Sequence, residues 1–82
     1  MASTPSGARV VVYGAAGCHL CERAREVVEE VCGDAWRYVQ IDGDEGLERR
    51  YRERIPVVEV DGEDAFTFFV EPDTLRERLA GA

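Results

Sequence analysis

The pattern of apolar and polar positions changes period early in the chain. Residues 9–13 (RVVVY) form a continuous, largely β-branched run that ends before Gly14, which is typical of a buried strand. After Cys18 the apolar residues follow the period of a helix and form a single stripe, made of Leu20, Ala24, Val27, Val28 and Val31. We expect this stripe, with Leu20, to face the core, and Gly33 to end the helix.

The rest of the chain predicts one further strand and helix, then a hairpin and a last helix. The expected elements are a strand at 36–41, a short helix at 47–52, strands at 55–60 and 65–69, and a helix that begins within 71–74 and continues through 79. Asp61-Gly62 is a hairpin turn signal, so the two strands beside it should be antiparallel. The first strand–helix–strand unit should place its strands in parallel. The fold class is therefore α/β with the order βαβαββα, a four-stranded mixed sheet flanked by helices.

Composition limits the chain to one small domain. Its 82 residues allow a single core, which we expect at residues 8–82, behind a disordered tail at 1–7. The net charge of −7 disfavours nucleic-acid binding, because phosphates require a basic face. The longest apolar runs are much shorter than the roughly 20 residues of a membrane helix. The chain begins without a secretory signal, so we expect a cytoplasmic monomer in which unpaired thiols stay reduced.

Two cysteines, Cys18 and Cys21, are separated by two residues and allow several chemistries. A structural zinc site needs four ligands, and Cys32 lies roughly 16 Å further along the predicted helix, so we expect no bound metal. Haem attachment requires histidine directly after the second cysteine, where this chain has Glu22. A static disulfide is disfavoured without export. A redox centre is the reading that these residues favour.

The predicted position of Cys18 supports redox chemistry. It falls where a loop becomes a helix, and the free N–H groups and the dipole at a helix N-terminus stabilise a thiolate and lower its pKa. Cys21 is one turn further, within reach of a mixed disulfide on Cys18. His19 should be exposed at the mouth of this site, where we expect it to contact the substrate and, when protonated, to tune Cys18.

The βαβαββα order, the Cys18-His-Leu-Cys21 motif after the first strand and the Ile55-Pro56 pair resemble the glutaredoxin branch of the thioredoxin fold. The resemblance covers residues 8–80 and extends to small bacterial glutaredoxin-like proteins with a CxxC motif. It implies that Cys18 attacks a disulfide and that Cys21 resolves the mixed disulfide. It also implies that Pro56 is a cis-proline and that the backbone of Ile55 pairs with the substrate.

The same resemblance implies partners. The substrate would be a disulfide-containing protein or a small-molecule thiol, and no organic cofactor would be bound. An external thiol reductant would recycle the protein: glutathione, another low-molecular-weight thiol or a thioredoxin-type reductase. Glutathione-using members carry a Gly-Gly pair and a polar residue after the fourth strand, whereas this chain has Val70-Glu71-Pro72-Asp73. Efficient use of glutathione is therefore not expected.

Several residues near this site have two interpretations. Arg54 and the arginines before it (Arg49, Arg50 and Arg52) would bind carboxylates of a substrate, or else form a solvated helix face with Glu45–Arg49 and Glu48–Arg52 pairs. Cys32 is either a third redox thiol or a small buried residue at the helix end, and we favour the second. Phe66, Phe68 and Phe69 are expected mainly in the core, with one of them exposed at the edge.

These observations favour a thiol–disulfide oxidoreductase that works through Cys18 and Cys21. Two other functions use the same residues. One is a redox-sensing or adaptor module that binds a partner through the motif and the proline loop without turnover. The other is a dimer bridged by an iron–sulfur cluster through Cys18.

Overall fold

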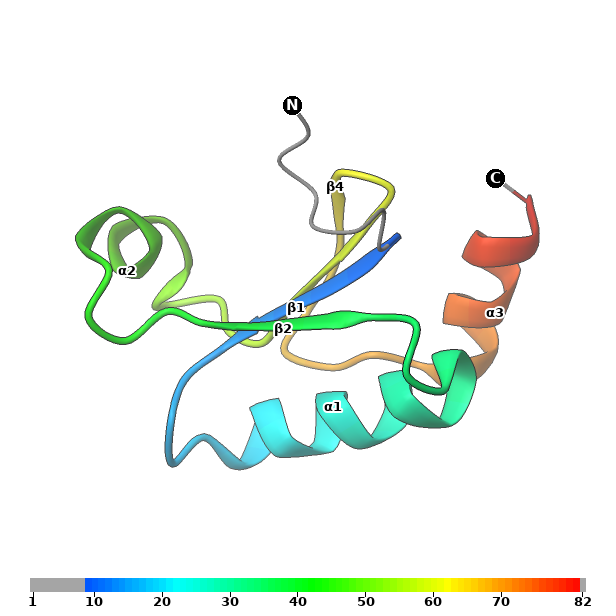
Figure 1. The fold of residues 1–82 in the computed structure, drawn as a ribbon, viewed down its shortest axis with the longest axis horizontal. Helices are drawn as coiled ribbons and strands as arrows, with labels where there is room; N and C mark the ends of the chain where they lie inside the picture. The colour runs from blue at the N-terminus through cyan, green and yellow to red at the C-terminus, as the bar shows by residue number, and fades with distance from the viewer. Residues whose placement is uncertain (1–8, 82) are drawn as a thin grey trace.

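A computed structural model describes residues 9–81 and confirms the predicted order βαβαββα (Figure 1). The expected tail at 1–7 lies outside the described residues. None of the helices described is both long and apolar enough to cross a membrane. The elements are β1 (Val10–Gly14), α1 (His19–Cys32), β2 (Arg37–Gln40), α2 (Glu45–Tyr51), β3 (Val57–Val60), β4 (Glu63–Thr67) and α3 (Pro72–Gly81).

The four strands form one mixed sheet in the order β2-β1-β3-β4. β1 pairs with β2 in parallel, and β3 pairs with both β1 and β4 in antiparallel orientation, so the predicted parallel unit and hairpin are confirmed. Asp61 and Gly62 connect β3 to β4, and both have positive φ, 53° and 87°. A two-residue turn of this kind matches the twist of the strands that it joins.

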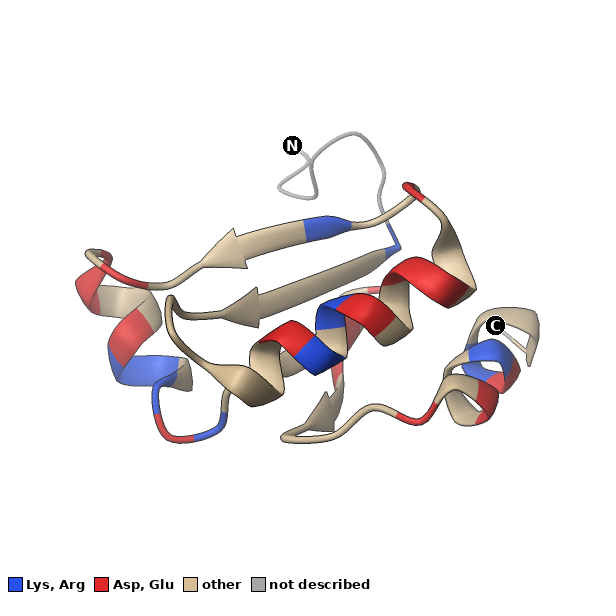
Figure 2. Ribbon diagram, turned by 90° about the horizontal axis from the view of Figure 1, so that it is seen from below, with Lys and Arg blue, Asp and Glu red and all other residues tan. Residues whose placement is uncertain are grey.

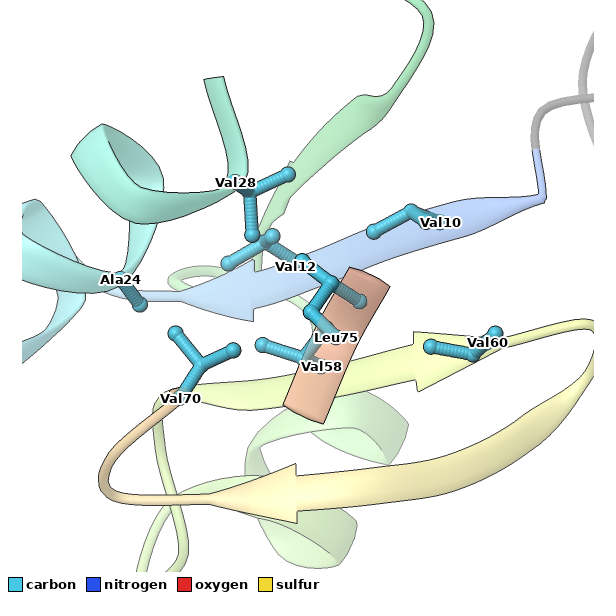
Figure 3. Close-up of a cluster of buried hydrophobic side chains, with 8 residues drawn as sticks. All are labelled: Val10, Val12, Ala24, Val28, Val58, Val60, Val70 and Leu75. Atoms are coloured by element: carbon cyan, nitrogen blue, oxygen red, sulfur yellow. The ribbon is translucent and has the colours of Figure 1, made fainter. Parts of the chain in front are cut away.

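Side chains alternate between the two faces of the sheet and build two hydrophobic clusters. The larger cluster lies between the sheet and the helices α1 and α3, and its buried members are Val10, Val12, Ala24, Val28, Val58, Val60, Val70 and Leu75 (Figure 3). The smaller cluster packs α2 against the other face through Ile41, Tyr51 and Val57. The sheet is thus flanked by helices, as predicted.

Helix α1 ends as predicted but does not bury its whole stripe. Gly33 has φ 67°, and its N–H donates to the carbonyl of Glu29 at 2.8 Å. Ala24 and Val28 are buried, whereas Leu20 is 37% exposed, so the expectation that Leu20 faces the core is wrong. Leu20 belongs to the first turn of α1, where the stripe borders an open groove instead of packed side chains.

The end of the hairpin also differs from the prediction. Strand β4 stops at Thr67, and Phe68 and Phe69 are 43% and 71% exposed, so the expectation that most of the phenylalanine cluster is core is wrong. Phe68 has φ 69°, and its N–H donates to the carbonyl of Pro56 at 2.9 Å. The Phe69 N–H donates back to Thr67 at 2.7 Å. The backbone leaves the strand at this point, so the two rings are not directed into the core by the pleat.

Candidate active site

Cys18 and Cys21 are joined by a disulfide at the N-terminus of α1. Their Cα atoms are 5.2 Å apart. Cys18 is the N-cap residue with an extended backbone, and its Sγ accepts the backbone N–H of Cys21 at 3.1 Å. Cys21 is buried and Cys18 is half-buried, so the sulfur of Cys18 is the more accessible of the two. An N–H aimed at this sulfur at a helix N-terminus is the environment that stabilises a thiolate.

The loop that delivers Cys18 is held by Asp42. The Oδ2 atom of Asp42 accepts the backbone N–H of Ala16 at 2.9 Å and the side-chain amide of Gln40 at 3.0 Å. Gly17 follows with φ 73° and turns the chain into α1. This role of Asp42 was not predicted from the sequence. The predicted parallel pairing of β1 and β2 could have indicated it, because this pairing brings the residues that follow both strands to one edge of the sheet.

Gly14, the last residue of β1, allows the helix to approach the sheet closely. A Cβ at this position would lie 3.0 Å from the Cβ of Cys21 and 3.1 Å from its Sγ. It would also lie 2.9 Å from the hydroxyl oxygen of Tyr38 on β2. The sulfur of Cys21 and the phenol of Tyr38 therefore both border the space that a single methyl group would occupy. Neither Gly14 nor Tyr38 stood out in the sequence.

The proline loop lies beside the same end of β1. Tyr13 pairs with Val57, and continuing this antiparallel register by one residue sets Gly14 opposite Pro56. The Ile55–Pro56 peptide bond is cis, which confirms the expectation drawn from the resemblance. Between residues 9 and 81, no backbone hydrogen bond involves Ile55. The structure thus brings Cys21, Gly14 and Pro56 together, and the pairing of Ile55 with a substrate stays a prediction.

His19 and Arg54, the two side chains predicted to lie near the substrate, have different surroundings in the structure. The side chain of His19 is 97% exposed, with Nδ1 4.0 Å from Glu22 Oε1. Arg54 makes contacts within the chain: its Nη2 lies 3.6 Å from Asp64 Oδ2, and its guanidinium carbon lies 5.5 Å from the centre of the Tyr51 ring. Their contacts with a substrate remain predictions.

Helix α2 gives partial support to the solvated-face interpretation of the other arginines. Arg52 lies 3.5 Å from Glu48, the expected i,i+4 pair. The expected Glu45–Arg49 pair is not among the ion pairs of residues 9–81.

Tyr13 and Cys32 have raised pKa values for reasons of packing. Burial, with a contribution from the Glu59 carboxylate, raises the pKa of Tyr13 to about 12, and its ring stacks on Tyr51 at 4.4 Å. Burial also raises the pKa of the Cys32 thiol, and Arg9 partly opposes this effect. No three histidine, cysteine, aspartate or glutamate side chains within 9–81 gather into a metal-binding group.

A groove of about 270 Å³ opens beside the disulfide motif, between α1 and the segment that joins β4 to α3. It is lined mainly by apolar side chains: Leu20, Ala24, Val27, Phe68, Phe69 and Val70, with Arg23 and Glu71. Figure 2 shows acidic and basic residues interspersed along α1. The sequence does not predict this groove, because its apolar pattern places Leu20 and most of the phenylalanines in the core.

Comparisons with known proteins agree with this geometry. Residues 9–80 match a family described as "Glutaredoxin-like domain (DUF836)". The X-ray structure of protein XcR50 from X. campestris is similar, with 30% identity, a TM-score of 0.77, and coverage of 89% of this chain and 97% of that one. The solution structure of protein Ne2328 from Nitrosomonas europaea has 32% identity and a TM-score of 0.65, with 85% and 88% of the two chains covered.

A more distant similarity concerns the fold alone. A mutant thioredoxin from Halobacterium salinarum is 22% identical with a TM-score of 0.61, and the match covers 88% of this chain and 71% of the thioredoxin. A search of the curated proteins found no match.

Proposed function

Because the chain belongs to the glutaredoxin-like domain family, we propose that it is a thiol–disulfide oxidoreductase that uses Cys18 as nucleophile and Cys21 as resolving thiol. The observation that carries this proposal is the Cys18–Cys21 disulfide at the N-terminus of α1, with the more accessible sulfur at the N-cap. A structural disulfide would not require this asymmetry between an accessible and a buried sulfur.

The thiols of Cys18 and Cys21 together supply the two electrons that reduce one substrate disulfide. In the reduced protein, the Cys18 thiolate attacks one sulfur of a substrate disulfide, forms a mixed disulfide and releases the other sulfur as a thiolate. Cys21 then loses its proton and attacks Cys18 Sγ, and the bond between Cys18 and the substrate breaks. Two electrons pass to the substrate, which leaves as two thiols after taking up two protons. An external thiol reductant returns two electrons to the Cys18–Cys21 disulfide.

The fixed elements around the disulfide support this sequence of steps. Asp42 holds the loop before Cys18, so the nucleophile is positioned before the substrate arrives. Gly14 lets Cys21 pack against the end of β1, which keeps the resolving thiol away from solvent. The free backbone of Ile55 beside Pro56 offers an edge on which a substrate segment could be aligned.

The test is turnover in a coupled assay that follows reduction of a small disulfide, with a reductase system as electron source. We expect Cys18→Ser to abolish turnover, since no other accessible thiol occupies a helix N-terminus. Cys32→Ser is the matched control and should keep full turnover. Cys21→Ser should trap the mixed disulfide, which mass spectrometry detects. A wild-type protein that forms the mixed disulfide but never turns over would be an adaptor or sensor, and a coloured dimer after anaerobic purification would indicate an iron–sulfur cluster.

A further inference from the structure

The groove between α1 and the segment after β4 holds an unusual share of the exposed apolar surface. Among residues 9–81, three large hydrophobic side chains are exposed, Leu20, Phe68 and Phe69, and all three line this groove. Exposed apolar side chains that gather in one place, unlike scattered ones, mark a binding surface. The floor of the groove is continuous with the core, because Ala24 and Val70 also belong to the buried cluster (Figure 3).

The backbone holds Phe68 in a conformation that favours this surface. Its φ of 69° lies in the left-handed region, which bulky side chains rarely adopt. A hydrogen bond from its N–H to the carbonyl of Pro56 links this residue to the proline loop. Residues kept in such regions are concentrated at functional sites. A backbone hydrogen bond therefore ties the aromatic wall of the groove to the proline next to the expected substrate edge at Ile55.

The position of the groove near Cys18 indicates which kind of molecule it binds. Leu20 is two residues beyond Cys18, so the groove begins within the first turn of the helix that Cys18 caps. A polypeptide that is disulfide-bonded to Cys18 can extend from there along the groove. From Leu20 to Val27 the groove follows α1 for roughly 10 Å, given a rise of about 1.5 Å per residue. An extended peptide covers that length with about three residues. The residues that flank a substrate cysteine would therefore reach the groove.

The size of the groove and the side chains that line it limit which molecules can bind there. A volume of about 270 Å³ accommodates one large side chain but lies below the range of most small-molecule sites. Only Arg23 and Glu71 carry charge among the lining residues. Glutathione bears two carboxylates and an ammonium group at neutral pH, and these would lose water against leucine and phenylalanine without enough partners. An uncharged aromatic or aliphatic side chain meets no such cost.

We propose that this groove binds a large apolar side chain within three residues of the target cysteine in a protein disulfide, so that the protein prefers polypeptide substrates with apolar flanks. This inference rests on the proposed oxidoreductase function and names its substrate class. Binding the flanking side chain raises the local concentration of the target disulfide at Cys18 and holds it there.

The experiment compares two peptides that differ at one position. Each carries a cysteine in a mixed disulfide with 5-thio-2-nitrobenzoate, and the residue two positions after the cysteine is phenylalanine in one peptide and serine in the other. Stopped-flow absorbance gives the second-order rate constant for reaction with the reduced protein. We expect the phenylalanine peptide to react about tenfold faster, which is typical of discrimination by an apolar pocket.

Variants of the groove test where this preference originates. Phe69→Ser should bring the ratio of the two rate constants close to one, and Leu20→Ser should reduce it in the same way. Glu77→Ser, at an exposed position on α3, should keep the wild-type ratio. Phe69 is 71% exposed, so its replacement should leave the fold intact, which circular dichroism verifies. An equal rate for the two peptides with the wild-type protein would overturn the proposal, and so would a preference that persists in both groove variants.

Two further outcomes separate the alternatives. If sedimentation shows a wild-type dimer that Phe69→Ser dissociates, a second copy of the chain covers the groove and the proposal is wrong. If the wild-type protein reacts with neither peptide nor with a small aromatic disulfide, the oxidoreductase function itself fails. Normal reaction with the small disulfide and no discrimination between peptides would reject the groove proposal alone.

Discussion

The two ends of α1 each carry a cysteine, and the two sulfurs lie in opposite environments. Cys18 precedes the first turn, where a backbone N–H points at its sulfur and Leu20 borders an open groove. Cys32 ends the last turn, where helix carbonyls disfavour negative charge, and it packs against the larger hydrophobic cluster. Residue type alone therefore does not decide the reactivity of a thiol. We expect helix direction and local packing to set the different reactivities of Cys18 and Cys32.

The sharpest test of this difference is the rate of alkylation. In reduced Cys21→Ser protein at pH 7, we expect Cys18 to react with iodoacetamide about 100-fold faster than Cys32, because the thiolate is the nucleophile. The pKa of Cys18 should lie below the ordinary value of about 8.5, whereas burial raises that of Cys32. Lowering the pH should therefore slow Cys32 first and Cys18 only in a more acidic range.

Peptide mapping by mass spectrometry between pH 5 and 10 assigns the rates to the two sulfurs. Cys18→Ser provides the control, in which the slow rate of Cys32 should be unchanged. A Cys18 midpoint at or above pH 8.5, or a faster Cys32, would show that helix position does not control these thiols.

Sequence patterns were sufficient for the parts of this fold that depend on local information. The period of the apolar stripe, the turn signal at Asp61-Gly62 and the stop at Gly33 each act over a few residues, and the structure confirms all three. The motif Cys18–Cys21 could be placed at a helix start for the same reason.

The parts that failed depend on contacts between distant segments. Leu20 fits the apolar stripe, and only the path of the chain after β4 determines whether anything covers it. Phe68 and Phe69 continue an apolar run, but the positive φ of Phe68 turns the backbone out of the strand. The roles of Asp42 and Gly14 arise from neighbours 26 residues away in one case and from β2 and α1 in the other. No single window of sequence contains such information.

A second prediction concerns the close packing of the N-terminal end of α1 against the end of β1. Gly14→Ala should destabilise the protein by about 1–3 kcal/mol, because the added Cβ would meet Cys21 and the Tyr38 hydroxyl at 2.9–3.1 Å. Urea unfolding of the oxidised protein measures this loss. Gly46→Ala in α2 is the matched control, since its Cβ meets only a side-chain atom of Asp44 at 3.5 Å. It should stabilise the protein by about 0.5–1 kcal/mol through helix propensity.

The double variant Gly14→Ala with Tyr38→Phe refines this result. Removal of the hydroxyl relieves one of the two close contacts, so part of the lost stability should return. Equal stability of Gly14→Ala and wild type would mean that β1 and α1 can separate without cost, and that the close packing of Cys21 is not needed.

The smallest expected effect concerns what the N-terminal end of α1 accepts as reductant. We expect glutathione with its reductase to recycle the oxidised protein about tenfold more slowly than a thioredoxin-type reductase or another small thiol. Exposed Phe68 and Phe69 and the carboxylate of Glu71 border the site, and Pro72 offers no N–H to a γ-glutamyl group. Glu71→Gln should raise the glutathione rate about twofold by removing one repulsive charge, whereas Glu77→Gln should leave it unchanged. Steady-state NADPH oxidation with a small disulfide as substrate gives these rates. Efficient, saturable turnover with glutathione in the wild-type protein would contradict this prediction, and it would show that this end of the helix binds a charged tripeptide despite its apolar walls.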